Sequence, residues 1–247
     1  MKHLFRIVTA LFLLGSATAS SSDPVRMTFA GPPPFVIAEG TSGISVDLIR
    51  AALAVNGHVL EVVIVPTKRM LLEMQLGNVD GTSSVQGLDY DDSQIFLGDG
   101  MFDYSDYFYT RSEQGLSINE PEDLRGLNVV TFPTAKNIYP IWLEPVVNEG
   151  GYIEVADQIS QVKMLYRGRA DAVLADASIF AFLTNQYLEE SGDARIEVSQ
   201  SKLIGRITSL PAFASETIRD DFNGGLSQLR ASGRYQEIFD AYIRQSP

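Results

Sequence analysis

The sequence predicts an α/β fold built as two lobes. Strand-like runs rich in β-branched residues alternate with segments whose apolar residues recur at helical spacing, a pattern typical of helices packed on largely parallel sheets. A short pattern of helix, glycine, one residue, apolar residue, aspartate and strand also occurs twice, around Asp80 and around Asp171. Two such units favour two lobes of related build, although two ordinary strand–helix–strand units can also resemble each other by chance.

The N-terminal segment has the pattern of a secretory signal peptide. Lys2 and Arg6 precede a compact apolar run, and Ala17-Thr18-Ala19 follows it as a cleavage signature. The run is too short for a membrane span, and a core strand is the less favoured alternative. We therefore exclude residues 1–19 from the fold and expect a periplasmic protein without membrane insertion. The chain has no cysteine, so it folds without disulfides.

The elements of the first half follow from apolar spacing and from turn residues. Asn56-Gly57 is a helix stop signal, and a dense apolar run ending at Pro66 suits a strand buried on both faces. The predicted order is strand 25–29, helix 46–55, strand 60–65, helix 69–76 and a strand that opens at Val79.

The second half continues the alternation. Glycine stops one helix at Gly168, and Pro133-Thr134 ends a strand. The last segment carries apolar residues at helical spacing on both sides of Gly233, which predicts two short amphipathic helices. The predicted order is a short helix at 120–124, strand 129–132, helix 160–167, a strand from Ala170, strand 203–210 and the two terminal helices.

The residue inventory argues against catalysis and against a resident metal. His58 is the one histidine beyond the signal segment and follows a helix stop, so we expect a surface turn residue rather than a member of a catalytic triad. Without cysteine there is no thiolate nucleophile or metal ligand. The acidic stretch Asp89–Asp106 lacks the glycine and terminal glutamate of an EF-hand, which favours a solvated loop over a calcium site. No phosphate-binding glycine loop or dinucleotide motif occurs, and we expect no cofactor.

The net charge of the chain argues against two classes of binding partner. The chain carries a formal charge of −12 at pH 7. Such a surface repels phosphate backbones and anionic headgroups, so we expect neither nucleic-acid binding nor adsorption to membranes.

A series of short motifs runs in order along almost the whole chain. They are Pro33-Pro34-Phe35, Gly43-Ile44-Ser45-Val46-Asp47-Leu48, Gly77-Asn78-Val79-Asp80, Tyr104-Ser105-Asp106-Tyr107, Glu122-Asp123-Leu124-Arg125-Gly126, Gly168-Arg169-Ala170-Asp171-Ala172, Asp176, Phe222-Asn223, Leu229, Gly233-Arg234-Tyr235, Ile238 and Tyr242. Each motif is weak by itself, but the ordered set is specific. Through these motifs and their order, the chain resembles the bacterial extracellular solute-binding protein family 3, which comprises the periplasmic receptors of polar amino-acid ABC transporters.

The resemblance implies a type II periplasmic-binding-protein-like fold, in which two crossover hinge strands join the lobes and the lobes close around a ligand. Residues 24–111 with 206–247 form one lobe and residues 112–205 the other. It implies a monomer that binds a small molecule and serves a membrane permease, or alternatively a ligand-sensing subunit of a membrane receptor. A dehydratase of cyclic phenylalanine precursors also resembles this family, and that chemistry requires an acid or base in the cleft, such as Asp176, Lys136 or Glu73.

Candidate site residues follow from the rule that open α/β sheets bind ligands beyond the carboxyl ends of their strands. The rule selects the loops after the strands at Val65, Val79 and Val129, the last of which meets a helix N-terminus suited to an anion. The resemblance implies that Asp176 holds the ligand's ammonium, while an N-cap of the following helix is the equal alternative. The predicted ligand-binding set is Phe35, Thr67, Arg69, Ser83, Ser84, Gln86, Thr134, Lys136, Asn137 and Asp176.

Two departures from the family pattern leave the ligand open. The family's Thr-Pro-Glu-Arg stretch, whose arginine pairs with the ligand carboxylate, is replaced by residues 89–94, which contain no arginine. The second-lobe Gly-Thr is reduced to Thr134. Arg69 or Lys136 could supply the missing charge, or could instead face solvent. The sequence therefore predicts a small polar solute that is amino-acid-like or a small carboxylate or amine.

Overall fold

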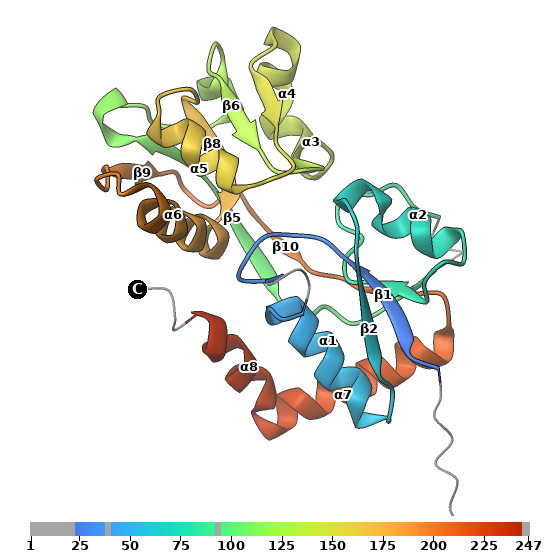
Figure 1. Cartoon of the computed structure of the whole chain (residues 1–247). Coiled ribbons are helices and arrows are strands. Elements are labelled where there is room, and N and C mark those ends of the chain that lie inside the picture. The colour runs from blue at the N-terminus through green and yellow to red at the C-terminus, as the bar shows by residue number, and fades with distance from the viewer. Residues whose placement is uncertain (1–22, 38–40, 92–94, 244–247) are drawn as a thin grey trace, which may run out of the picture.

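The structure is a computed structural model that describes residues 23–37, 41–91 and 95–243 (Figure 1). The predicted signal peptide at residues 1–19 lies outside the described residues, as does Asp92 of the acidic stretch. The described chain forms two mixed sheets, each flanked by its own helices. The two sheets are the centres of two lobes, which confirms the predicted two-lobed α/β fold.

The first lobe is built on a five-stranded sheet in the order β2-β1-β3-β11-β4. Its parallel part pairs β1 with β2 and with β3, and β11 runs antiparallel to β3 and β4. The predicted double-sided burial of β2 is wrong: this strand is at the sheet edge, and Ile64 is 49% exposed. The strands are β1 (Val25–Phe29), β2 (Leu60–Ile64), β3 (Gly81–Thr82), β4 (Phe96–Leu97) and β11 (Ala212–Phe213).

Helices α1 (Ile44–Val55), α2 (Met70–Gln75), α7 (Glu216–Ser232) and α8 (Arg234–Ile243) cover this sheet. Helices α1 and α7 approach closely because Gly225 has no side chain, and a Cβ there would lie 2.0 Å from the Ala52 carbonyl oxygen. His58 follows the turn at the end of α1, as the sequence predicts, and is partly buried. Its Nε2 lies 2.8 Å from Asp221 Oδ2, so it joins the end of α1 to α7.

The second lobe is built on a six-stranded sheet in the order β10-β5-β8-β6-β7, with β9 paired to β5. All five residues of the central strand β8 are buried. The strands are β5 (Asp103–Arg111), β6 (Val129–Thr131), β7 (Tyr152–Glu154), β8 (Ala172–Asp176), β9 (Val198–Gln200) and β10 (Gly205–Thr208). The helices are α3 (Ala135–Ile138), α4 (Pro140–Glu149), α5 (Ile159–Tyr166) and α6 (Ala177–Ser191).

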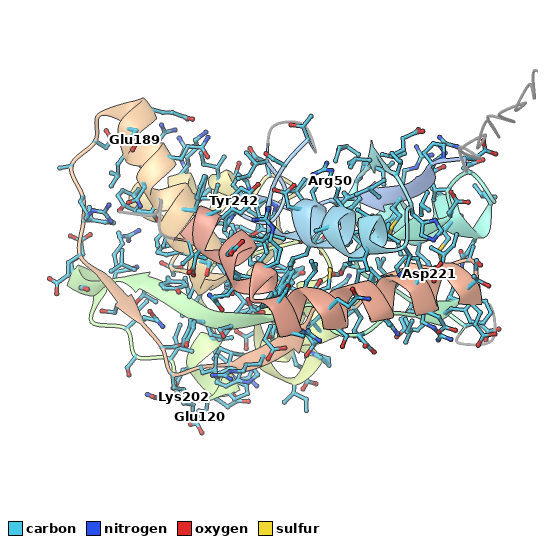
Figure 2. The ribbon with its side chains drawn as sticks, turned by 90° about the horizontal axis from the view of Figure 1, so that it is seen from below. Arg50, Glu120, Glu189, Lys202, Asp221 and Tyr242 are labelled. Carbon is cyan, nitrogen blue, oxygen red and sulfur yellow. The ribbon has the colours of Figure 1, made fainter. Side chains whose placement is uncertain are left out.

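Strands β5 and β10 run antiparallel to each other between the lobes and form the two crossovers (Figure 1). The Thr208 hydroxyl donates to Asp103 Oδ1 over 2.6 Å where the pair meets the first lobe. Seen from below, Asp221 on α7 lies near one end of the molecule, and Glu189, Glu120 and Lys202 of the second lobe lie toward the other (Figure 2). Within residues 23–37, 41–91 and 95–243, the chain therefore passes between the lobes through these two neighbouring strands.

The internal sequence repeat has the same structure in both lobes. The Arg26 N–H donates to Asp80 Oδ2 over 2.8 Å, and the Asn128 N–H donates to Asp171 Oδ2 over 2.8 Å. In return the aspartate N–H donates to the carbonyl of Arg26 or of Asn128, over 2.7 and 2.9 Å. Each aspartate thus fixes the start of a strand against its parallel neighbour. One copy lies in each lobe, so the repeat reflects a shared local structure.

Candidate functional site

A cavity of about 110 Å³ lies between the lobes. Its walls come from the loops after β1, β2 and β3 in the first lobe, from both crossover strands, and from β6, β8 and their following loops in the second lobe. A groove of about 520 Å³ adjoins it, because Gly31, Thr67, Pro133 and Gln158 line both. The cavity is therefore at the carboxyl ends of strands from two sheets, where the topology rule places a ligand.

Five of the predicted site residues line this cavity. The first lobe contributes Thr67, Ser84 and Gln86, and the second contributes Thr134 and Asp176. The Ser84 hydroxyl donates to the Gln86 side-chain oxygen, and Gln86 Nε2 donates to the Thr208 carbonyl over 2.5 Å. The first-lobe wall is therefore a connected polar surface that is anchored to crossover strand β10.

The other five predicted residues lie outside the cavity lining. Phe35 is buried in an aromatic cluster and stacks on Phe102 with ring centroids 4.7 Å apart. Ser83 is buried beside the sheet, while its neighbour Ser84 reaches the cavity, as expected for successive residues of extended chain.

The predicted cations lie apart from the cavity as well. The exposed Arg69 side chain forms an ion pair with Glu73 one helical turn away. Lys136 and Asn137, on the short helix α3, border a surface depression beside α4 instead of the cavity, and Asn137 also reaches Gly87 of the first lobe. Neither Arg69 nor Lys136 therefore replaces the missing carboxylate-binding arginine in this structure.

Asp176 acts as the N-cap of α6. Its Oδ1 accepts from the Ser178 and Ile179 N–H groups over 2.9 and 3.1 Å, and its Oδ2 accepts from the Ser105 N–H over 2.7 Å. Burial raises the pKa of this carboxyl, while the backbone donors oppose the rise. The side chain also lines the cavity, so the cap is compatible with the predicted contact to a ligand, which remains a prediction.

Asp106 is a second buried carboxyl in the cavity wall, and sequence reasoning missed it. It lies directly opposite Asp176 in the β5–β8 register and is 3% exposed. The expectation that the acidic stretch Asp89–Asp106 is a solvated loop is wrong at this position, because β5 begins at Asp103. Period-two alternation along β5 places Asp106 on the face of Tyr104 and Phe108. The sequence feature that could have identified Asp106 is its position inside the aromatic-Ser-x-aromatic motif Tyr104-Ser105-Asp106-Tyr107.

The electrostatic state of Asp106 follows from its surroundings. Burial raises its pKa to about 7, and the nearby Asp176 adds to the rise. The Tyr139 hydroxyl donates to Asp106 Oδ2 over 2.7 Å and partly offsets this effect. Among the described residues that line the cavity, none is lysine, arginine or histidine. The cavity is therefore acidic.

The two lobes touch on both sides of the cavity. Lys68 Nζ in the first lobe lies 2.6 Å from Glu154 Oε1 in β7. Asn137 Nδ2 donates to the Gly87 carbonyl over 2.8 Å, and a Cβ on Gly87 would lie 2.6 Å from Thr134 Oγ1. Thr134 is the only non-glycine residue with positive φ among the described residues, at 72°. These contacts join the two lobes directly.

No protein-family model and no curated protein sequence matches the chain. Solved structures match it over most of its length. A histidine kinase sensor domain with similarity to periplasmic binding proteins has a TM-score of 0.70 and 17% identity, covering 89% of this chain and 95% of that one. The chain has the fold of a two-lobed periplasmic binding protein.

Two further structures with this binding-protein fold were solved with ligands. The GluR0 ligand-binding core from Nostoc punctiforme, in complex with L-glutamate, has a TM-score of 0.67 and 20% identity, covering 89% of this chain and 99% of that one. The amino acid ABC transporter substrate-binding protein AbpA from Streptococcus pneumoniae, bound to L-arginine, has a TM-score of 0.68 and 14% identity, covering 90% and 95%. The match extends over both lobes and both crossover strands.

No helix among the described residues is long and apolar enough to cross a bilayer. No three acidic or histidine side chains of the described residues gather into a group that could hold a metal ion.

Proposed function

We propose that this chain is a periplasmic solute-binding protein that closes its lobes on a small polar solute and passes it to an ABC-type permease. The observation that carries the proposal is the cavity between the lobes, where polar side chains of both lobes face one volume. Ligand sites are concave and hold a few convergent polar groups. Closure of two lobes around such a volume is an established form of ligand capture.

The ligands of structurally similar proteins support a solute of the amino-acid class. AbpA was solved with L-arginine and the GluR0 core with L-glutamate. The proposal includes export through the segment 1–19 and a monomeric state. It also includes a division into 24–111 with 206–247 and 112–205, which counts β5 and most of β10 with the first lobe although these crossover strands pair within the sheet of the second. It also includes the absence of catalysis: of the three candidate acid–base groups, Glu73 and Lys136 lie outside the cavity lining, and Asp176 is engaged by three backbone N–H groups.

Sensing is the second candidate, and the observation that favours it is the sensor domain among the similar structures. A sensing subunit and a transport receptor capture the ligand in the same way, so they differ in the membrane partner. Co-purification with a permease supports transport, and co-purification with a membrane receptor supports sensing.

A thermal-shift screen of the mature protein tests the proposal. The panel contains amino acids, amines, small carboxylates and peptidoglycan fragments, because a solute that binds only the folded state raises the melting temperature. We expect one chemical group of solutes to raise it, and calorimetry then to give one site per chain. Unchanged melting temperatures across the whole panel contradict the proposal.

A further inference from the structure

The charges that line the whole cleft are predominantly negative. The cavity wall holds Asp106 and Asp176, and the adjoining groove adds Glu154 and Asp157. Lys68 is the one cation in these two linings, and it is paired with Glu154. A buried carboxylate of a ligand would need a positive partner. The described cleft residues offer none that is free, so the cleft favours a ligand without that group.

The two cavity carboxyls lie close to one another and leave one oxygen open. Directly opposite residues of an antiparallel pair have Cβ atoms roughly 4.5–5.5 Å apart on one face of the sheet, which is the relation of Asp106 to Asp176. The contacts of Asp176 are all backbone N–H groups. Asp106 Oδ2 accepts from Tyr139, but no described residue donates to its Oδ1. A buried carboxyl that lines a cavity thus has unused acceptor capacity.

A second acceptor in the same wall lacks a donor. Gln158 lines both the cavity and the groove, and its Oε1 is buried without a hydrogen-bond partner among the described residues. Buried acceptors are costly when they stay unpaired. Three acceptors from β5, β8 and the start of α5 therefore surround one volume. A ligand that fills it is favoured when it supplies hydrogen-bond donors.

We propose that the solute is an organic cation, an amine or a guanidine, whose donor end lies between Asp106, Asp176 and Gln158 and which needs no carboxylate for recognition. This inference rests on the proposed solute-binding function and narrows its ligand class. An ammonium or guanidinium group carries several donors and the opposite charge. Its pairing with a buried carboxylate offsets the desolvation of both groups. The net charge of −12 also attracts such a ligand to the protein.

Binding of a cation at this place releases a proton. The titratable groups near Asp106 are Asp176 on β8, Tyr139 before α4 and Tyr104 on the same face of its own strand, with Tyr109 on the opposite face of that strand. Burial raises the pKa of each of these tyrosines, so they stay neutral at physiological pH. The cation stabilises the ionised form of Asp106, and affinity is therefore highest above the pKa of Asp106 in the empty cavity.

Calorimetry with matched probe pairs tests the inference. The pairs are L-arginine with agmatine, L-lysine with cadaverine and L-ornithine with putrescine, each amine being the amino acid without its carboxylate. L-Glutamate and L-glutamine serve as anionic and neutral probes. At pH 8 we expect one amine to bind at least about tenfold more tightly than its parent amino acid, because the cleft holds no free cation for the carboxylate. Between pH 6 and pH 8 we expect its affinity to rise about tenfold, following ionisation of Asp106.

Asp106→Asn assigns the effect to one carboxyl. The variant keeps an oxygen for the Tyr139 hydroxyl, and we expect at least about tenfold weaker amine binding at pH 8, with no pH dependence. Asp220→Asn is the matched control, since it removes one carboxylate from the exposed surface of α7. We expect this control to bind within about twofold of the original chain.

The outcomes separate the inference from the function. If the parent amino acids bind as tightly as their amines, the inference is overturned and the solute-binding function still holds. The same follows if L-glutamate or L-glutamine binds as tightly as the amines. A failure of every solute class overturns the function and the inference together. If Asp106→Asn does not fold, the pH dependence of the original chain decides, and a flat profile between pH 6 and pH 8 overturns the role of Asp106.

Discussion

The ligand-free protein carries a measurable destabilisation at Asp106. Folding raises the pKa of this carboxyl from 3.8 to about 7 through burial, which corresponds to about 4 kcal/mol of folding free energy. Because the pKa is higher in the folded state, the folded protein keeps a proton on Asp106 at pH values where the unfolded chain has released it. Below pH 3.8 the carboxyl is protonated in both states and causes no destabilisation. As the pH rises through 7 that stability is lost, and above pH 7 the destabilisation is complete.

Asp106→Asn removes this titration and keeps the oxygen that accepts from Tyr139. We therefore expect the variant and the original chain to be similarly stable near pH 4, and the variant to be more stable by up to about 4 kcal/mol at pH 8. Other groups titrate in both proteins, so the difference between the two isolates Asp106.

Urea unfolding followed by circular dichroism, without ligand and at several values between pH 4 and pH 8, measures the difference directly. A stability difference that grows with pH supports the electrostatic account. A difference that is constant across this range, or a variant that is less stable at pH 8, refutes the argument that Asp106 is a buried carboxyl lacking a cationic partner.

Three further substitutions test the site. Asp176→Ala removes a cavity carboxyl and the N-cap of α6. We expect calorimetry to show at least about tenfold weaker solute binding, and the free energy of unfolding to fall by about 1 kcal/mol. Unchanged affinity would exclude Asp176 from the site. Gly87→Ala places a Cβ against Thr134 and should weaken binding by opposing closure. Its control, Gly77→Ala, has a similar positive φ with open space around it and should leave affinity unchanged; equal losses in both refute the closure argument. Lys68→Met removes an exposed ion pair between the lobes, and we expect a loss of no more than about 1 kcal/mol in binding free energy; a larger loss means that Lys68 contacts the solute.

The sequence predicted the architecture because the fold depends on local patterns. Apolar spacing with Gly and Pro stops located most helices and strands of both lobes. The repeated aspartates at Asp80 and Asp171 marked equivalent units, since each aspartate receives a backbone N–H of the neighbouring strand. Short strands such as β4 and β7 have no periodicity to detect, because they are two and three residues long. They depend on tertiary pairing.

Only part of the site was predicted. The topology rule identifies which loops border the cleft, but it does not say in which direction their side chains point. It selected the loops that contribute Thr67, Ser84 and Thr134 to the cavity. It also selected Lys136, whose direction depends on the short helix α3. Asp106 escaped the rule because it lies within a crossover strand, so its position depends on the β5–β8 register. The pairing register of two strands about seventy residues apart in the sequence cannot be predicted from the local spacing of apolar residues.

Capture of a solute by lobe closure is the central claim, and the distance between the lobes tests it most directly. The chain has no cysteine, so Leu72→Cys on α2 and Ile141→Cys on α4 place one spin label on each lobe, at positions that are 45% and 74% exposed. Pulsed electron paramagnetic resonance then gives the distribution of label distances. The account predicts that the solute which raises the melting temperature shifts this distribution to shorter, narrower distances. Identical distributions with and without saturating solute would contradict it.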